Sequence, residues 1–404
     1  MLAAGDVDGM RVVLDWVSGF IPLALARTAA LLPGQAGIFF TEVSDINGLY
    51  QSSLYGCIAS HDHPPGYPVW LEGKESGGWT RFDFGGNGHG PHAGLMALDY
   101  FWQTQDLVAA AKYIPIATHS LDFFMTHFLN RTADGNLMIW PSQVLETYWC
   151  DWPGWNSSTC ATNDLPQLAA VAALASGLLQ LPVNSGLLTP AQRAAYAAFE
   201  RIIPPLPNNG TIFVPAQSYD HVMHNVETPE MYGSHPFRRV SVGRTAADPS
   251  TAAALAMGVA TLENSFAHGK SGCNGGWCQS VMNAALVGLA NTSLELVWGR
   301  ADTGPAPGFR YPAFAPKAQD SAPSADHYAN MNTALQLMLL QSGEDGVNGS
   351  LVLLPAWPCW LDVSFKLWGA MNTSVEVVYA NSSLVSLDVQ PPSRAAAVKW
   401  ANCV

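Results

Sequence analysis

Hydrophobic and polar positions follow a helical period over most of this 404-residue chain. Apolar residues recur three to four positions apart in successive segments, which is typical of helices that pack against a core. Breaks rich in Pro and Gly, such as Pro33-Gly34, end these segments. The pattern predicts helices over residues 6–32, 91–104, 107–130, 165–181, 190–202, 249–266, 275–300 and 327–342.

The pattern changes after Leu351. The runs "SVEVVYA" and "SLVSLDVQ" alternate apolar and polar residues and are separated by "NSS", which predicts a β-hairpin. We therefore expect a helical domain over residues 1–345 and a small β-strand domain over 346–404. The chain has no fixed-period repeat, which argues against a solenoid. A mainly α fold of helix pairs arranged as an α/α toroid, with its loops gathered at one mouth, is the most economical architecture.

Composition limits the classes of partner. Hydrophobic residues make up 49% of the chain and include 14 Trp, so a large buried core is expected. The net charge is −13 and no basic stripe occurs, which disfavours nucleic acid and anionic membrane surfaces. The apolar run over 11–32 contains Asp15, Pro22 and Arg27, and the run over 168–182 is too short to cross a bilayer. We expect no membrane span.

Sequons and cysteines point to the secretory pathway. Two close cysteine pairs, Cys150/Cys160 and Cys273/Cys278, suit local disulfides. The start of the chain has no signal peptide, so the prediction of a secreted protein requires that the true N-terminus is missing. The alternative to a secreted protein is that the sequons occur by chance and that the cysteine thiols stay reduced. The sequons begin at Asn130, Asn156, Asn209, Asn291, Asn348, Asn372 and Asn381.

The stretch "WPSQVLETYWCDWPGW" places the carboxylate of Glu146 among four tryptophans in a chain with only 12% charged residues. Glu146 either accepts hydrogen bonds from loop N–H groups or is kept protonated for chemistry. Trp149, Trp152 and Trp155 have helical spacing and could belong to the core. Pro153-Gly154 makes a helix unfavourable there and favours a loop platform for sugar rings.

Further candidate binding residues lie in loops and at predicted helix starts. Asp326 precedes an apolar helix, where it could act as an N-cap alone. We expect one of Arg238 and Arg239 to pair with a neighbouring glutamate and the other to be structural. The remaining candidates are Tyr148, Glu227, Glu230, Trp277, Gln279 and His327.

Metal and cofactor chemistry have little support in the sequence. The segments "HDH" at 61–63 and "GHGPH" at 88–92 lack a second ligand cluster at zinc spacing. No GxSxG elbow, Walker loop or dinucleotide-binding GxGxxG is present. We expect no cofactor.

Several ordered segments resemble a known family. "PSQVLETYW" is similar to the loop that carries the acid glutamate in six-hairpin, (α/α)6-barrel glycoside hydrolases, in particular the α-L-fucosidase family 95 type. "DYFWQTQD" is similar to the aromatic-rich helix that precedes this loop in that family, and "ADHYANMNTALQLMLLQS" and "LLPAWP" are similar to later segments. The resemblance runs from about residue 10 to the C-terminus. It implies a six-hairpin toroid followed by a small β-domain.

By this resemblance Glu146 is the general acid and Asp326 is the carboxylate that activates the attacking water. An inverting enzyme needs two such carboxyl groups about 6.5–9.5 Å apart. Glu42 and Asn47 fall where a further mouth loop would lie. The family's N-terminal β-domain and an early helix have no counterpart here, so we expect the toroid to be incomplete at its N-terminus. "ETYW" also replaces the Pro-Glu-Asn that is usual in the fucosidases.

The resulting hypothesis is an inverting glycoside hydrolase that acts on an oligo- or polysaccharide without a cofactor. One alternative is a carbohydrate-binding pseudoenzyme that lacks part of the catalytic apparatus. Another is a polysaccharide lyase on a similar toroid, although lyases usually face uronates with Arg or Lys. The sequence indicates neither the sugar, nor its linkage, nor the oligomeric state.

Overall fold

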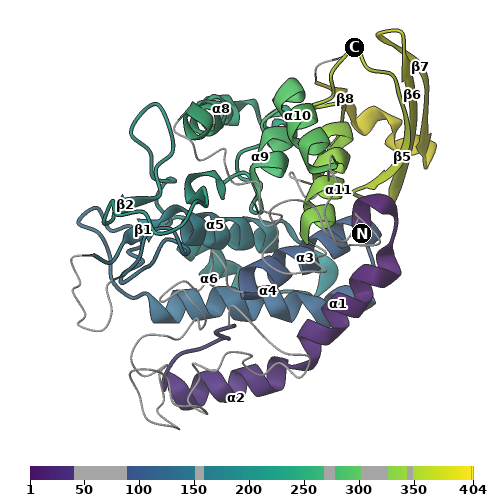
Figure 1. The fold of residues 1–404 in the computed structure, drawn as a ribbon. Helices are drawn as coiled ribbons and strands as arrows, with labels where there is room; N and C mark the ends of the chain where they lie inside the picture. The colour runs from purple at the N-terminus through teal and green to yellow at the C-terminus, as the bar shows by residue number, and fades with distance from the viewer. Residues whose placement is uncertain are drawn as a thin grey trace, which may run out of the picture.

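The computed structural model describes residues 1–40, 89–150, 159–267, 278–301, 326–343, 349–401 and 403. Within these ranges the chain forms a helical body followed by a C-terminal β region (Figure 1). The predicted division into helices and then strands is therefore confirmed at the level of the fold class.

The N-terminal segment forms two helices instead of the one predicted over 6–32. Helix α1 covers Val7–Gly19 and α2 covers Ile21–Leu31. The chain bends at Phe20, directly before Pro22 in the first turn of α2, because proline fits the start of a helix and disrupts its interior.

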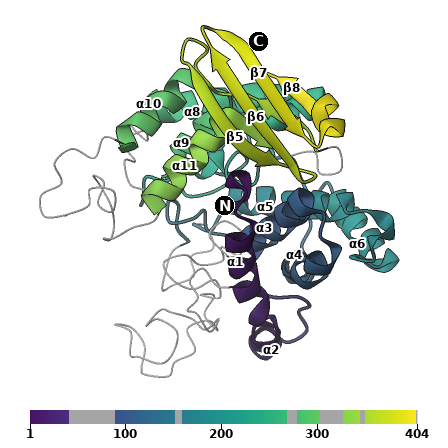
Figure 2. The same ribbon diagram turned by 90° about the vertical axis from the view of Figure 1, so that its right-hand side faces the viewer.

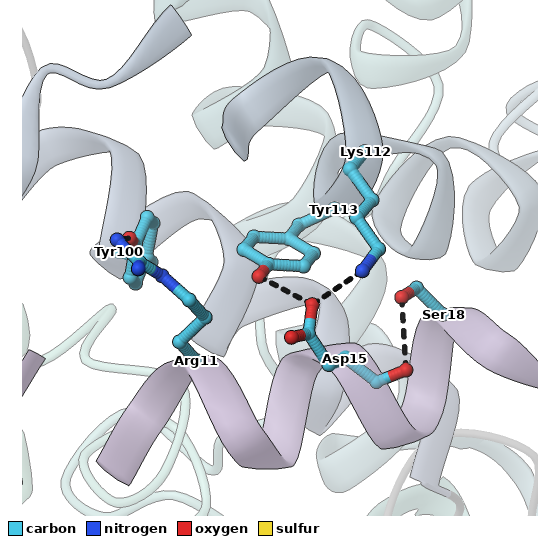
Figure 3. A network of polar contacts seen from close by, with 6 residues as sticks. All are labelled: Arg11, Asp15, Ser18, Tyr100, Lys112 and Tyr113. Atoms are coloured by element: carbon cyan, nitrogen blue, oxygen red, sulfur yellow. Dashed lines mark hydrogen bonds and ion pairs between the residues drawn. The ribbon is translucent and has the colours of Figure 1, made fainter. Parts of the chain in front are cut away.

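Helix α1 is tied to the helices that follow it. Asp15 accepts hydrogen bonds from Tyr113, at 2.6 Å, and from Lys112, and Arg11 donates to the Tyr100 hydroxyl at 3.2 Å (Figure 3). Among the described residues, the stretch Val7–Ala30 alone is long and apolar enough to cross a membrane by length and composition. These polar contacts instead explain how α1 packs against α3 and α4.

Four helices form the largest hydrophobic cluster. They are α3 (His89–Thr104), α4 (Leu107–His127), α5 (Leu165–Gln180) and α6 (Pro190–Glu200). Asp106 and Asp164 cap α4 and α5, and Thr189 forms a capping box on α6. Each of these helices lies close to its predicted range.

Helices α3 and α5 approach each other closely and run parallel. Gly94 of α3 faces Leu174 of α5, and Gly177 of α5 faces Leu98 of α3, so the contacts advance in the same direction along both helices. A Cβ atom at either glycine would overlap the facing leucine, which explains why glycine occupies both positions.

The second half of the helical body is more broken than predicted. Its helices are α7 (Val242–Ala247), α8 (Ala252–Ala267), α9 (Ser280–Leu286), α10 (Ala290–Ala301) and α11 (Asp326–Leu339). The single helix expected over 275–300 is interrupted at Gly288, which has a φ of +85°. Short helix α7 was not predicted.

Small sheets complete the fold. Strands β5 (Val363–Gly369), β6 (Thr373–Ala380) and β7 (Ser383–Gln390) form an antiparallel sheet that lies at the top of Figure 2, above helices α1 to α6. The predicted hairpin is β6–β7, and its turn residues Asn381 and Ser382 both have positive φ. Two sheets were not predicted: β3 (Leu340–Ser342), β4 (Leu351–Leu353) and β8 (Val398–Trp400), and the pair β1 (Thr162–Asp164) and β2 (Ala216–Ser218).

The disulfide predictions are confirmed in part. Cys150 and Cys160 form the expected local disulfide, and Cys278 is disulfide-bonded. Cys273 lies outside the described residues. A further disulfide, Cys359–Cys403, closes the C-terminal region and was not predicted, because its two cysteines are 44 residues apart.

Candidate functional site

Glu146 lies at the tip of a tight turn. Val144 and Tyr148 pair across this turn, and the backbone N–H of Val144 donates to the Tyr148 carbonyl at 3.1 Å. Leu145 is fully buried and has a φ of +51°, so it anchors the turn in the core. The Glu146 side chain is half-buried, and its Oε2 accepts a hydrogen bond from the Asn225 amide at 2.9 Å. The turn thus presents one oriented carboxylate.

A second carboxylate, that of Glu227, lies against the same turn. Its Oε2 accepts hydrogen bonds from the backbone N–H of Glu146 at 3.2 Å and from the Thr147 hydroxyl at 3.3 Å. The backbone N–H of His224 donates to the Thr147 carbonyl at 2.9 Å. These contacts join the Glu146 turn to residues 224–227 and bring the predicted residues Glu146 and Glu227 together.

An exposed aromatic face adjoins Glu146. The Trp149 ring is 39% exposed and stacks on His224, with ring centroids 4.3 Å apart and planes 6° apart. The Trp149 indole N–H donates to the backbone carbonyl of Glu146 at 2.5 Å. Tyr148, by contrast, is 8% exposed and packs edge-on against Tyr219, so it offers little surface to a ligand.

A buried polar network holds the segment that leads into the Glu146 turn. Asp164 caps α5 and accepts hydrogen bonds from the Ser142 hydroxyl and from the Gln167 amide, the latter at 2.7 Å. Burial raises the pKa of Asp164 to about 6, although these hydrogen bonds oppose the shift. The Cys150–Cys160 disulfide closes the other side of the loop. These hydrogen bonds and the disulfide therefore restrict the movement of the segments on both sides of the turn.

A cavity of about 340 Å³ lies between α3, residues 235–238 and α11. Its volume is within the range of small-molecule sites. Gln279, a predicted binding residue, lines it and donates to the Tyr232 hydroxyl at 3.2 Å. Tyr232 also belongs to the hydrophobic cluster that contains Leu145, which links the cavity to the Glu146 turn. The other lining residues are His92, Leu95, Met96, Asp99, His235, Pro236, Arg238, Thr333 and Leu337.

An ion pair forms one wall of this cavity. Nη2 of Arg238 lies 2.6 and 2.7 Å from the two carboxylate oxygens of Asp99. Burial, together with His92 and Arg238, lowers the pKa of His235 to about 3, so this imidazole is neutral at ordinary pH. The described carboxylate partner of Arg238 is Asp99 of α3, and the expected pairing of an arginine of this segment with a neighbouring glutamate stays a prediction.

Comparisons with known proteins bear on the fold. No protein-family profile matches the chain, and no curated protein matches its sequence. A solved structure described as a "putative kojibiose phosphorylase from human microbiome" matches with a TM-score of 0.56 and 10% sequence identity. The match covers 92% of this chain and 47% of that chain, so this protein spans about half the length of its structural relative. The match establishes the fold alone.

This structural likeness supports the predicted mainly helical fold at a coarse level. It does not extend to the closed toroid or to the fucosidase resemblance. Both remain predictions.

The remaining predicted residues are not brought to the Glu146 turn by the described structure. Glu230 is 6% exposed, and Ser265 of α8 donates to its Oε1 at 3.5 Å, so it lies in the interior. Asp326 and His327 begin α11, but their side chains lie outside the described residues. Glu42, Asn47 and Trp277 lie wholly outside them.

Asn225, His224 and Asp99 were not singled out from the sequence, and His92 was considered only as part of a weakly supported metal-binding segment. Asn225 and His224 stand two and three residues before Glu227, and a search for polar residues near a candidate carboxylate would have included them. No local signal marks Asp99, because its partner Arg238 is 139 residues away. Among the described residues, no group of three or more His, Cys, Asp or Glu side chains could hold a metal ion.

Proposed function

We propose that this protein is a carbohydrate-active enzyme that cleaves an O-glycosidic bond, with Glu146 as the general acid. The observation that carries the proposal is the position of Glu146. Its carboxylate is half-buried at the tip of a turn and accepts a hydrogen bond from the Asn225 amide. The fold shared with a protein named as a disaccharide phosphorylase supports the same class of substrate.

In the proposed reaction Glu146 donates a proton to the leaving glycosidic oxygen as the bond to the anomeric carbon breaks. Water attacks the anomeric carbon from the opposite face, which inverts its configuration. The carboxylate of Asp326 takes the proton that the water loses. Before the next turnover Asp326 releases this proton to solvent and Glu146 regains one from solvent.

Glu227 is assigned a positioning role in this scheme. Its Oε2 already accepts hydrogen bonds from the Glu146 backbone and from Thr147. These bonds fix the turn that carries the acid, and a fixed acid reaches the leaving oxygen without reorganisation in the transition state.

The Trp149–His224 pair supplies the sugar-binding face. Its stacked rings offer a flat apolar surface, and the apolar face of a pyranose packs well on such a surface. Because the rings are neighbours of Glu146 in the structure, a sugar held there places a glycosidic oxygen near the carboxylate.

Phosphorolysis is a second candidate, favoured by the name of the structural relative. In that reaction inorganic phosphate replaces water as the nucleophile while the proton donor keeps its role. Dependence of turnover on phosphate separates the two reactions.

The test is release of reducing sugar from a panel of oligosaccharides, polysaccharides and aryl glycosides, with and without inorganic phosphate. The parent is compared with Glu146→Gln and with a matched control, Glu263→Gln, since Glu263 is an exposed glutamate on α8. The proposal expects turnover in the parent and the control, and a loss of about 10²–10⁴-fold in Glu146→Gln. Sugar binding without turnover by any of the three proteins would identify a pseudoenzyme instead.

A further inference from the structure

A second, smaller cavity lies at the far end of α5 from the Glu146 turn. Its volume is about 50 Å³, and it is bounded by α3, α5, residues 237–239, Arg244 of α7 and Gly343. Three of its lining residues are arginines, Arg238, Arg239 and Arg244. The whole chain has only 18 Lys and Arg residues and a net charge of −13. A local concentration of positive charge is therefore unusual here.

The three arginines differ in how their charge is balanced. Arg238 is neutralised by Asp99, which lines the same cavity. Within the part of the chain that the structure describes, the Arg239 and Arg244 guanidinium groups form neither an ion pair nor a hydrogen bond. Burial and the nearby charge of Arg244 lower the pKa of Arg239 to about 10, and Glu200 opposes this shift. Two positive charges thus face one small cavity.

Among the residues that the structure describes, other charges offset only part of this excess. The carbonyl end of α5 at Gln180 is equivalent to about half a negative elementary charge, against two guanidinium groups. Glu200 acts on Arg239 and Asp248 acts on Arg244, but both carboxylates are exposed, so solvent screens these interactions. Holding two guanidinium groups together in a partly buried place costs free energy, and a bound anion removes that cost.

We propose that Arg239 and Arg244 form a binding site for a tetrahedral oxyanion, namely a phosphate or sulfate group. Guanidinium groups donate paired N–H bonds that match the oxygens of such an anion. The neighbouring polar groups are the Ser176 hydroxyl and the Gln180 amide, which lie 3.2 Å apart and line the cavity beside the arginines.

This site is separate from the Glu146 turn. Leu145 of the turn belongs to the same hydrophobic cluster as Leu165, the first residue of α5, whereas the polar groups of α5 that line the cavity, Ser176 and Gln180, lie near its last turn. Eleven residues of helix separate Leu165 from Ser176, which is about 17 Å at 1.5 Å per residue. An anion here is therefore distinct from the nucleophile of a phosphorolytic reaction, and the inference does not depend on the proposed function.

The test is titration calorimetry without sugar, at constant ionic strength, with inorganic phosphate, sulfate and a phosphate monoester as separate probes. Arg239→Gln and Arg244→Gln each remove one guanidinium. Arg201→Gln is the matched control, because Arg201 is an exposed arginine at the end of α6 and does not line the cavity. Glu146→Gln serves as the control for binding at the turn.

We expect saturable binding in the parent and in both controls, and affinity at least about tenfold weaker in Arg239→Gln and in Arg244→Gln. Tighter binding of the free anion than of the monoester identifies inorganic anion as the ligand, and the reverse order identifies an esterified phosphate. If Arg239→Gln does not fold, Arg244→Gln and the parent isotherm decide the question. The proposal is overturned by absence of saturable binding in the parent, by equal weakening in Arg201→Gln, or by loss of binding only in Glu146→Gln.

Discussion

The side-chain amide of Asn225 lies 2.9 Å from Oε2 of Glu146, although the two residues are 79 positions apart. Residues 224–227 thereby close over the Glu146 turn, and Glu227 and His224 add backbone contacts to it. The carboxylate is held in one direction by a segment that follows α6, far along the chain.

This relationship predicts the behaviour of Asn225→Ala. Loss of a hydrogen bond to a charged or reacting carboxyl costs about 1.5–3 kcal/mol, so we expect kcat to fall about 10- to 100-fold with little change in KM. Steady-state kinetics measure this split, with the exposed residue Asn184 as control in Asn184→Ala. An unchanged kcat in Asn225→Ala would show that the hydrogen bond does not position the acid.

Trp149→Ala removes the exposed ring of the stacked pair. An aromatic contact of this kind contributes about 0.5–1.5 kcal/mol beyond its area, so we expect KM to rise about 3- to 10-fold while kcat changes less. Trp298→Ala is the control, because Trp298 of α10 is 72% exposed and lines none of the described cavities. Equal effects of the two substitutions on KM would contradict the sugar-binding face.

Asp99→Asn leaves Arg238 without its carboxylate partner. The pair is about three-quarters buried, and the substitution removes the Asp99 charge that offsets the guanidinium, so we expect the free energy of unfolding to fall by about 1–3 kcal/mol. Urea denaturation measures the change. The exposed pair Lys366–Glu376 is the comparison, and Lys366→Gln should cost less than about 1 kcal/mol.

Asp164 predicts a pH dependence of stability. Its pKa is raised by burial from 3.8 to about 6, so between these values the folded state binds the proton more tightly than the unfolded state. The contribution of Asp164 to the free energy of unfolding is therefore present at low pH. This contribution, about 1–3 kcal/mol, is lost as pH rises through about 6. Urea unfolding of the parent and of Asp164→Asn at pH 4.5 and pH 7 tests this. The variant should gain stability relative to the parent at the higher pH, and a constant difference would contradict the prediction.

Local patterns predicted most of the helices and the C-terminal hairpin. Asn381-Ser382 between alternating strands is a short-range signal, and the caps Asp106 and Asp164 are equally local. The breaks at Phe20 and Gly288 were missed, because the apolar periodicity continues across each of them and only the positions of Pro22 and Gly288 mark them.

The candidate site was predicted less fully. Glu146 and Glu227 were named from their surroundings in the sequence, and their contact came only from tertiary structure, since 81 residues separate them. Asp99 and Arg238 are farther apart still, so the ion pair and the cavities that it lines could not be read from a single sequence.

The role of Glu146 as the group that protonates the leaving oxygen is tested most directly by comparing kcat/KM of Glu146→Gln on substrates with different leaving groups. A sugar leaving group needs a proton, whereas a dinitrophenolate leaves as an anion without one. The account predicts that Glu146→Gln loses about 10²–10⁴-fold in kcat/KM on an oligosaccharide and less than about tenfold on the matching dinitrophenyl glycoside. Equal losses on both substrates, or no loss on either, would contradict it.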